Sequence, residues 1–266
     1  MSSISQILSL LTAGTLMISG TLNAAAPQND VDGLLFLANR QYMVSEAYEP
    51  EDLEMSDVPG QVRRLRPAAA AALREMFQAC KAETGVQLLS ISGYRSYDKQ
   101  KGIYQRKLRS VKKNVAKAQE YVAPPGASEH QLGVAMDVGQ KHKVNLEVSF
   151  AKTEGAKWCR ENCWRFGFIL RYDEPWEKVT GYKYEPWHFR YVGKEYAKEI
   201  YDANIPLETW LIGHRVEVMK ELVSHGVGTG WKVEEPQEEL ILIPLLPATS
   251  TDLPATPTDL AGTGAD

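Results

Sequence analysis

The sequence predicts an α+β domain in which a small, mostly antiparallel sheet is covered by helices packed outside it. Several segments carry apolar residues at helical spacing, and short runs rich in small and branched residues lie between them. The order is helix, strand, helix, strand, helix and then paired strands, which favours an α+β arrangement.

The clearest element is a helix over Pro67–Thr84, because Pro stands in its first turn and Gly85 follows as a stop. A strand over Val86–Ser92 and a helix over Asp98–Gln119 are expected next. The polar stretch 41–59 is expected to be a wrapping loop. Further strands are predicted at 133–138, 168–172 and 185–192, and further helices at 153–166, 195–204, 207–213 and 215–224.

The two ends of the chain differ from its centre. Residues 1–26 contain an apolar stretch followed by three alanines, which predicts a signal peptide cleaved near Ala26 or a membrane anchor. Either interpretation puts the rest of the chain outside the cytoplasm. Residues 27–231 are expected to form one domain. Residues 232–266 are rich in Pro, Thr, Ala and Asp, and are expected to be a disordered tail.

Two short segments combine residues that bind metal ions. In Ser128–Asp137 the imidazole of His130 precedes the carboxylate of Asp137 by seven residues, and Gly133 between them allows the chain to double back. The segment Glu185–His188 adds a carboxylate and a second imidazole. Zinc accepts such a mixture of nitrogen and oxygen ligands, so we expect the two segments to meet.

The number of candidate ligands suggests their roles. A catalytic zinc site needs three protein ligands and an open position for water. His130, Asp137 and His188 supply the three ligands, which leaves Glu185 to act as general base. If Glu185 were a ligand instead, Asp137 would be the carboxylate left to accept a proton. The sequence therefore predicts a zinc cofactor with a separate base.

Three blocks occur in a fixed order: Ser92–Ser96; Ser128–Asp137, with the pattern Ser-x-His-x-x-Gly-x-Ala-x-Asp; and Glu185–His188, with the pattern Glu-x-Trp-His. Together they resemble the VanY-type zinc D-alanyl-D-alanine carboxypeptidase family, which is related to VanX-type dipeptidases. The likeness extends from about residue 34 to residue 212 and includes Trp164–Tyr172. It implies a Hedgehog/DD-peptidase-like fold and a zinc carboxypeptidase domain over residues 27–231.

The resemblance implies an extracytoplasmic enzyme that removes the terminal D-alanine from peptidoglycan stem peptides ending in D-Ala-D-Ala. An L,D-carboxypeptidase and a peptidoglycan endopeptidase are alternatives on the same zinc site, because the shared motifs do not describe the shape of the pocket. A non-catalytic cell-wall-binding module is an alternative of another class, and it would be expected to lack a ligand or the base.

The resemblance also implies roles for residues outside the metal site. Arg95 is expected to stabilise the developing oxyanion or to grip the substrate, a role that suits a fixed guanidinium. Ser128 and Gln100 correspond to positions that contact the terminal carboxylate of the substrate. Trp187 is expected to pack beside the metal.

Other peptidase classes are disfavoured. The Ser-x-x-Lys string of penicillin-binding serine peptidases occurs three times, at 96–99, 110–113 and 149–152, which indicates chance, and neither Lys-Thr-Gly nor Ser-Asp-Asn is present. The His-Glu-x-x-His motif of thermolysin-like proteases is absent from the sequence. Three cysteines are too few for a disulfide scaffold or a cysteine zinc site, so we expect buried thiols.

The net charge of the chain and its one basic run indicate which classes of partner it could bind. The net charge of -4 gives no reason to expect a nucleic-acid partner. The basic run Lys107–Lys117 is interpreted as a solvated helix face, with binding of an anionic cell-wall polymer as the alternative.

Overall fold

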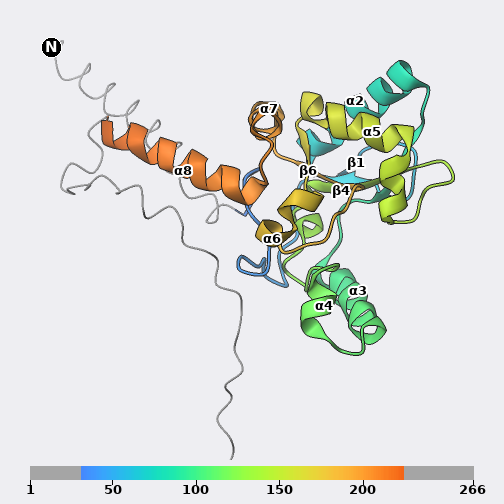
Figure 1. The fold of residues 1–266 in the computed structure, drawn as a ribbon, viewed down its shortest axis with the longest axis horizontal. Coiled ribbons are helices and arrows are strands. Elements are labelled where there is room, and N and C mark those ends of the chain that lie inside the picture. Colours follow the sequence, from blue (N-terminus) through green and yellow to red (C-terminus); the bar gives the residue numbers. More distant parts are fainter. Residues whose placement is uncertain (1–30, 225–266) are drawn as a thin grey trace, which may run out of the picture. The chain divides into compact units, whose positions relative to one another are not determined.

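The computed structural model describes residues 31–224, and a four-stranded antiparallel sheet lies at their centre (Figure 1). Its strands are β3 (Leu88–Ser92), β4 (Ala135–Gln140), β6 (His188–Tyr191) and β5 (Phe168–Leu170), in that spatial order. Neighbouring strands pair antiparallel throughout. The predicted α+β class with a small antiparallel sheet is confirmed.

The predictions for the chain ends concern residues that the structure does not describe. The signal peptide or anchor at 1–26 and the tail at 232–266 lie outside residues 31–224. Within the described residues, none of the helices is both long enough and apolar enough to cross a bilayer.

Helix α2 (Pro67–Thr84) forms where it was predicted, with Pro at its start and Gly85 in the left-handed conformation (φ 77°) at its end. Its apolar face buries Leu73, Met76 and Phe77. This face packs in one core with strand residues such as Phe189 and with α5 (Glu154–Asn162). Burial of this apolar area is the main term that holds α2 and α5 against the sheet.

A second core holds the C-terminal helices. Helices α7 (Lys194–Ala203) and α8 (Leu207–Ser224) pack their apolar residues against β5 and the segment around Leu35. Trp210 and Leu211 of α8 are buried there. The shorter elements are β1 (Glu54–Met55), β2 (Arg64–Leu65), α6 (Glu177–Thr180) and the 3₁₀ helices Glu129–Leu132, Val148–Lys152, Cys163–Phe166 and Glu174–Trp176.

Several predicted boundaries were wrong. The single helix expected over 98–119 is two helices, α3 (Tyr97–Ser110) and α4 (Val115–Gln119). The chain breaks between them because Lys112 and Lys113 take left-handed φ angles of 54° and 63°, which a helix cannot accommodate.

The prediction for the C-terminal helices had the opposite error. The two helices expected at 207–213 and 215–224 are one continuous helix, α8. The intervening Gly213 weakens a helix without ending it. Part of the stretch 41–59 also differs from the predicted loop, since Glu54–Met55 pairs with Arg64–Leu65.

All three cysteines are buried free thiols, as predicted.

Gly133 joins the 3₁₀ helix Glu129–Leu132 to β4 and turns the chain between two candidate ligands. Its φ of 70° is left-handed, and its carbonyl accepts a hydrogen bond from the Arg66 amide at 2.8 Å. A Cβ on Gly133 would lie 2.7 Å from Cδ2 of Leu53. The position therefore disfavours a side chain on conformational grounds, and an added Cβ would also force the half-buried Leu53 side chain to move.

We expect Gly133→Ala to destabilise the fold by more than Gly85→Ala does. Both glycines are left-handed, but a Cβ on Gly85 would meet no atom within 4 Å. Gly85→Ala should therefore cost only the conformational term of about 1 to 2 kcal/mol. The overlap at Gly133 should add roughly 0.5 to 1.5 kcal/mol, because the Leu53 side chain must move. Urea unfolding of both variants measures the difference, and equal losses would contradict the steric argument.

Candidate metal and active site

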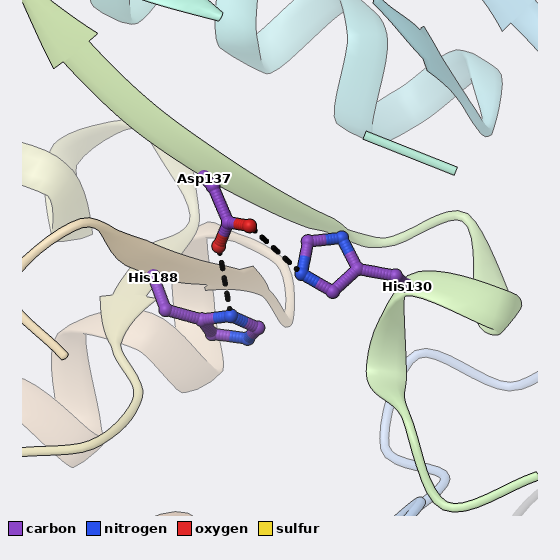
Figure 2. Close-up of side chains that lie close together, drawn as sticks. All are labelled: His130, Asp137 and His188. Carbon is purple, nitrogen blue, oxygen red and sulfur yellow. Dashed lines mark hydrogen bonds and ion pairs between the residues drawn. The ribbon is translucent and has the colours of Figure 1, made fainter. Parts of the chain in front are cut away.

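The pairing of β4 with β6 brings the first two candidate ligands together. Asp137 on β4 lies directly opposite His188 on β6 in the antiparallel register. Their side chains lie on one face of the sheet, and Nδ1 of His188 is 3.1 Å from Oδ1 of Asp137 (Figure 2). Both residues are buried, so the carboxylate and the imidazole meet in a site that excludes most water.

His130 reaches the same point from the 3₁₀ helix that precedes β4. Its Nε2 lies 3.3 Å from Oδ2 of Asp137 (Figure 2), and its carbonyl accepts a hydrogen bond from the Arg95 amide at 3.1 Å. One ligand atom from each of His130, Asp137 and His188 lies within 4.8 Å of the others. Two atoms bound to one tetrahedral ion at its usual bond lengths are separated by about 3.3 Å. The distances from the two imidazole nitrogens to the nearer oxygen of Asp137, 3.3 Å and 3.1 Å, are close to this value.

The remaining nitrogen of each histidine has an acceptor. Nδ1 of His130 lies 2.8 Å from the carbonyl oxygen of Gly93, and Nε2 of His188 lies 3.3 Å from Oε2 of Glu129. A carbonyl and a carboxylate only accept, so both nitrogens donate. The opposite nitrogens face Asp137, and once deprotonated they can present their lone pairs to a metal ion, which is the arrangement by which metal-binding histidines are oriented. This set of donors fits a divalent metal ion.

Glu129 is a buried carboxylate that the sequence reasoning did not single out. Its Oε1 accepts a hydrogen bond from Nε of Arg171 at 2.8 Å and lies 3.0 Å from Nη1 of Arg190. Arg171 also binds Glu208 of α8, at 2.6 Å and 2.9 Å. A signal was present in the sequence, because both arginines interrupt apolar strand segments, and buried charges need partners.

The buried charges shift one another's protonation. Burial by itself would raise the pKa of Glu129, but Arg171 and Arg190 outweigh it and hold that pKa well below its usual range. Burial would likewise raise the pKa of Asp137, and the two imidazoles keep it low. For His188, burial acts to lower the pKa, but hydrogen bonds to Asp137 and Glu129 raise it to about 9. Both carboxylates therefore stay ionised at neutral pH.

Glu185 stands beside the three candidate ligands. It lies in a turn before β6, closed by a hydrogen bond from the His188 amide to the Glu185 carbonyl at 3.1 Å. The prediction of an extended strand from 185 was therefore wrong, and the turn carries the carboxylate to 3.8 Å from Nδ1 of His188. Burial raises the pKa of Glu185 to about 8, a value suited to proton transfer near neutral pH.

Arg95 and Ser128 lie together at the edge of this cluster. Arg95 donates to Oγ of Ser92 at 3.2 Å and to Oγ of Ser128 at 3.4 Å. Burial lowers the pKa of Arg95, while Asp137 and Glu185 act against that shift. Its Nε is buried and has no partner among the described residues, so the guanidinium keeps hydrogen-bonding capacity.

The cluster lies in a pocket of about 600 Å³, a size that suits a bound small molecule or peptide end. Arg95, Ser128, Gln100 and Trp187 all line it, together with the three candidate ligands and Glu185. Gln100 is almost fully buried and donates to the Ala123 carbonyl at 2.6 Å. Its amide nitrogen is thus already engaged by the backbone, and its carbonyl oxygen has no partner among the described residues.

The sequence of the chain is similar to proteins of one known family. Residues 62–194 match the VanY family, described as D-alanyl-D-alanine carboxypeptidase. The chain is 44% identical to YodJ of Bacillus subtilis over 186 residues, which are 67% of each chain. It is 37% identical to the D-alanyl-D-alanine carboxypeptidase of Enterococcus faecalis over 201 residues, 72% of this chain and 70% of the relative.

Several solved structures are also similar to the chain. The L,D-carboxypeptidase LdcB is 44% identical with a TM-score of 0.64, over 68% of this chain and 86% of LdcB. VanYB in complex with D-alanine-D-alanine is 37% identical with a TM-score of 0.58, over 66% of this chain and 96% of VanYB. A VanY D,D-pentapeptidase mutant, solved with Zn(II), is 36% identical with a TM-score of 0.57, over 66% of this chain and 98% of that one.

We expect Glu129→Gln to weaken the binding of a divalent metal ion by roughly 10- to 100-fold, because His188 loses the carboxylate that orients it. The fold should also lose roughly 3 to 5 kcal/mol, since two buried guanidiniums lose a charged partner. Chelator competition and urea unfolding measure the two effects. Glu83→Gln is a suitable control, because Glu83 binds Arg165 and Trp158 at the surface. Unchanged metal affinity in Glu129→Gln would contradict the orienting role.

Metal affinity is expected to rise by up to about tenfold per pH unit between about pH 6 and pH 9, because the metal displaces a proton from His188. The metal-free protein should become less stable over the same range. A folded pKa of about 9, against 6.5 for a free histidine, gives stability that is complete below about pH 6.5 and lost as pH rises through 9. The pKa of Glu185 is also raised, to about 8, so its ionisation likewise makes the metal-free protein less stable as the pH rises. Metal affinity independent of pH in this window would contradict the assignment.

Proposed function

Because the chain belongs to the VanY family of D-alanyl-D-alanine carboxypeptidases, and is therefore a carboxypeptidase, we propose that it is zinc-dependent and removes the terminal D-alanine from peptidoglycan stem peptides ending in D-Ala-D-Ala. The observation that carries this proposal is the convergence of His130, Asp137 and His188 on one point, with Glu185 beside them. Since peptidoglycan lies outside the cytoplasm, the proposal includes an extracytoplasmic location.

In this proposal His130, Asp137 and His188 hold the zinc ion. Two neutral imidazoles and one carboxylate are a usual ligand set for catalytic zinc, and they leave a position open. Zinc bound there supplies Lewis acidity, which lowers the pKa of water and polarises a carbonyl group. The family resemblance and the Zn(II) complex of a VanY enzyme support this choice of metal.

Glu185 is the proposed general base and acid. Its carboxylate accepts a proton from the attacking water while the water oxygen forms a bond to the carbonyl carbon of the scissile peptide. It then gives this proton to the leaving nitrogen as the carbon–nitrogen bond breaks and D-alanine departs. The raised pKa of about 8 supports both transfers, because neither protonation state is strongly disfavoured near neutral pH.

Arg95 is proposed to stabilise the negative charge that develops on the carbonyl oxygen. Its guanidinium is held by Ser92 and Ser128, so little reorganisation is needed when the charge appears. Ser128 and Gln100 are proposed to contact the terminal carboxylate. Ser128 fits this role with its hydroxyl in the pocket, whereas Gln100 would have to share an amide nitrogen that already binds Ala123. Trp187 is proposed to form part of the wall beside the metal.

An L,D-carboxypeptidase that acts on a tetrapeptide with one terminal D-alanine is the second candidate. The observation that favours it is the likeness to LdcB, which has higher identity and TM-score than the likeness to VanYB. Both candidates use the same ligands and base, and they differ in the residue that precedes the scissile bond.

The deciding experiment measures D-alanine release from a pentapeptide ending in D-Ala-D-Ala and from the matching tetrapeptide, with and without a chelator. Glu185→Gln should reduce release by at least about 10²- to 10⁴-fold and leave zinc bound. Glu174→Gln is the matched control, because Glu174 lines the same pocket and has no proposed role.

Zinc-dependent release from the pentapeptide supports the D,D assignment, and release from the tetrapeptide alone moves it to L,D. Release that survives Glu185→Gln at the wild-type rate would contradict the proposed base.

A further inference from the structure

Basic residues are concentrated in one short part of the chain. Between Lys99 and Lys117, 19 residues include eight Lys or Arg and no Asp or Glu. The rest of the chain contains 22 basic and 34 acidic residues, so an acidic protein carries one strongly positive segment. This segment comprises nearly all of α3, the 111–114 turn and the start of α4, and we call α3, the turn and α4 the basic hairpin.

The cations of the basic hairpin are exposed and are not neutralised. Seven of the eight are exposed, and the eighth, Lys107, lies with Nζ 3.9 Å from the centre of the Tyr121 ring. Within residues 31–224, none of the eight forms an ion pair with a carboxylate, whereas basic residues elsewhere, such as Arg74, Arg165 and Lys194, do. Like charges at this density repel one another and destabilise the helices that carry them.

At the tip of the basic hairpin, two charged residues have a backbone conformation that other residue types adopt more readily. Lys112 and Lys113 are consecutive left-handed residues, with φ of 54° and 63°. Gly or Asn adopts this conformation more readily than Lys. Two lysines at such positions and unpaired cations around them are both unfavourable for the isolated fold. A solvated helix face, which the sequence suggested, would need neither feature.

The basic hairpin stands at the rim of the proposed active site. Helices α3 and α4 lie side by side and project from the sheet (Figure 1). Gln100 and Ile103 on the inner face of α3 line the catalytic pocket. On its outer face, the exposed side chains are polar or charged without exception, so α3 offers no apolar group for insertion into a bilayer. In the rest of the basic hairpin, Val115 at the start of α4 is the one large apolar side chain that is exposed.

We propose that the basic hairpin binds a linear phosphate-bearing polymer attached to the cell wall, and so holds the enzyme beside its substrate. The 14 residues of α3 extend over about 21 Å, and its cations are spread along that length. Many weak contacts with successive phosphates suit this arrangement better than one small anion does, because binding then draws on counterion release at each contact. The choice of a wall polymer rests on the proposed function.

The test is cosedimentation of the full chain with purified bacterial walls that carry covalently attached phosphodiester polymer, and with the same walls stripped by hydrofluoric acid. One variant replaces four hairpin cations outside the pocket with Gln: Arg109, Lys112, Lys113 and Lys117. The control replaces four exposed lysines elsewhere with Gln, which gives the same change in net charge: Lys81, Lys152, Lys157 and Lys220.

We expect the hairpin variant to bind intact walls at least about tenfold more weakly than the control, with a shallower dependence on salt. Stripping should reduce wild-type binding to the level of the hairpin variant. D-Alanine release from a soluble peptide should be the same in all three proteins, which shows that the variants are folded. If the wild type does not cleave the peptide, the proposed function is contradicted. The comparison of wall binding between the variants would still be valid.

Two outcomes would overturn the proposal. One is binding of the hairpin variant to intact walls as tightly as the control. The other is wild-type binding that stripping does not reduce, and this result together with hairpin-dependent binding to phosphatidylglycerol vesicles would identify a membrane surface instead.

Discussion

The register between β4 and β6 is the constraint on which the site depends. It sets Asp137 opposite His188, and side chains alternate between the faces of a strand. A slip of one residue would turn one of these side chains to the other face of the sheet. The other groups are brought to this pair by short turns at the strand ends, with His130 before β4 and Glu185 before β6. The sheet thus fixes the centre of the site, and the turns complete it.

The buried charge around Glu129 links this centre to the rest of the chain. Arg190 binds Glu129 and also donates to the carbonyls of Leu34 and Phe36. Arg171 binds Glu129 and, through Glu208, the start of α8. Burying these ions is costly, but each has a partner of opposite charge. The N-terminal segment and the last described helix are therefore tied to the carboxylate that orients His188.

Local chemistry explains why some features were predictable. The start and end of α2 depend on Pro67 and Gly85, whose backbone preferences hold in any surroundings. Other features depend on contacts that no local pattern describes. The helix break at Lys112 and Lys113 occurs within a sequence that favours helix. The turn at Glu185 was not predicted, because the sequence of its segment favours an extended strand.

The sequence by itself determined the fold class, the family and the set of residues that could bind a metal, because these follow from residue types at fixed spacing. Tertiary structure alone decided how those residues are held. Glu129 lies 42 residues from Arg171 and 59 from His188 along the chain. Side chains so far apart meet only when a sheet register and a packed core bring them together, and their ionisation depends on the burial that results.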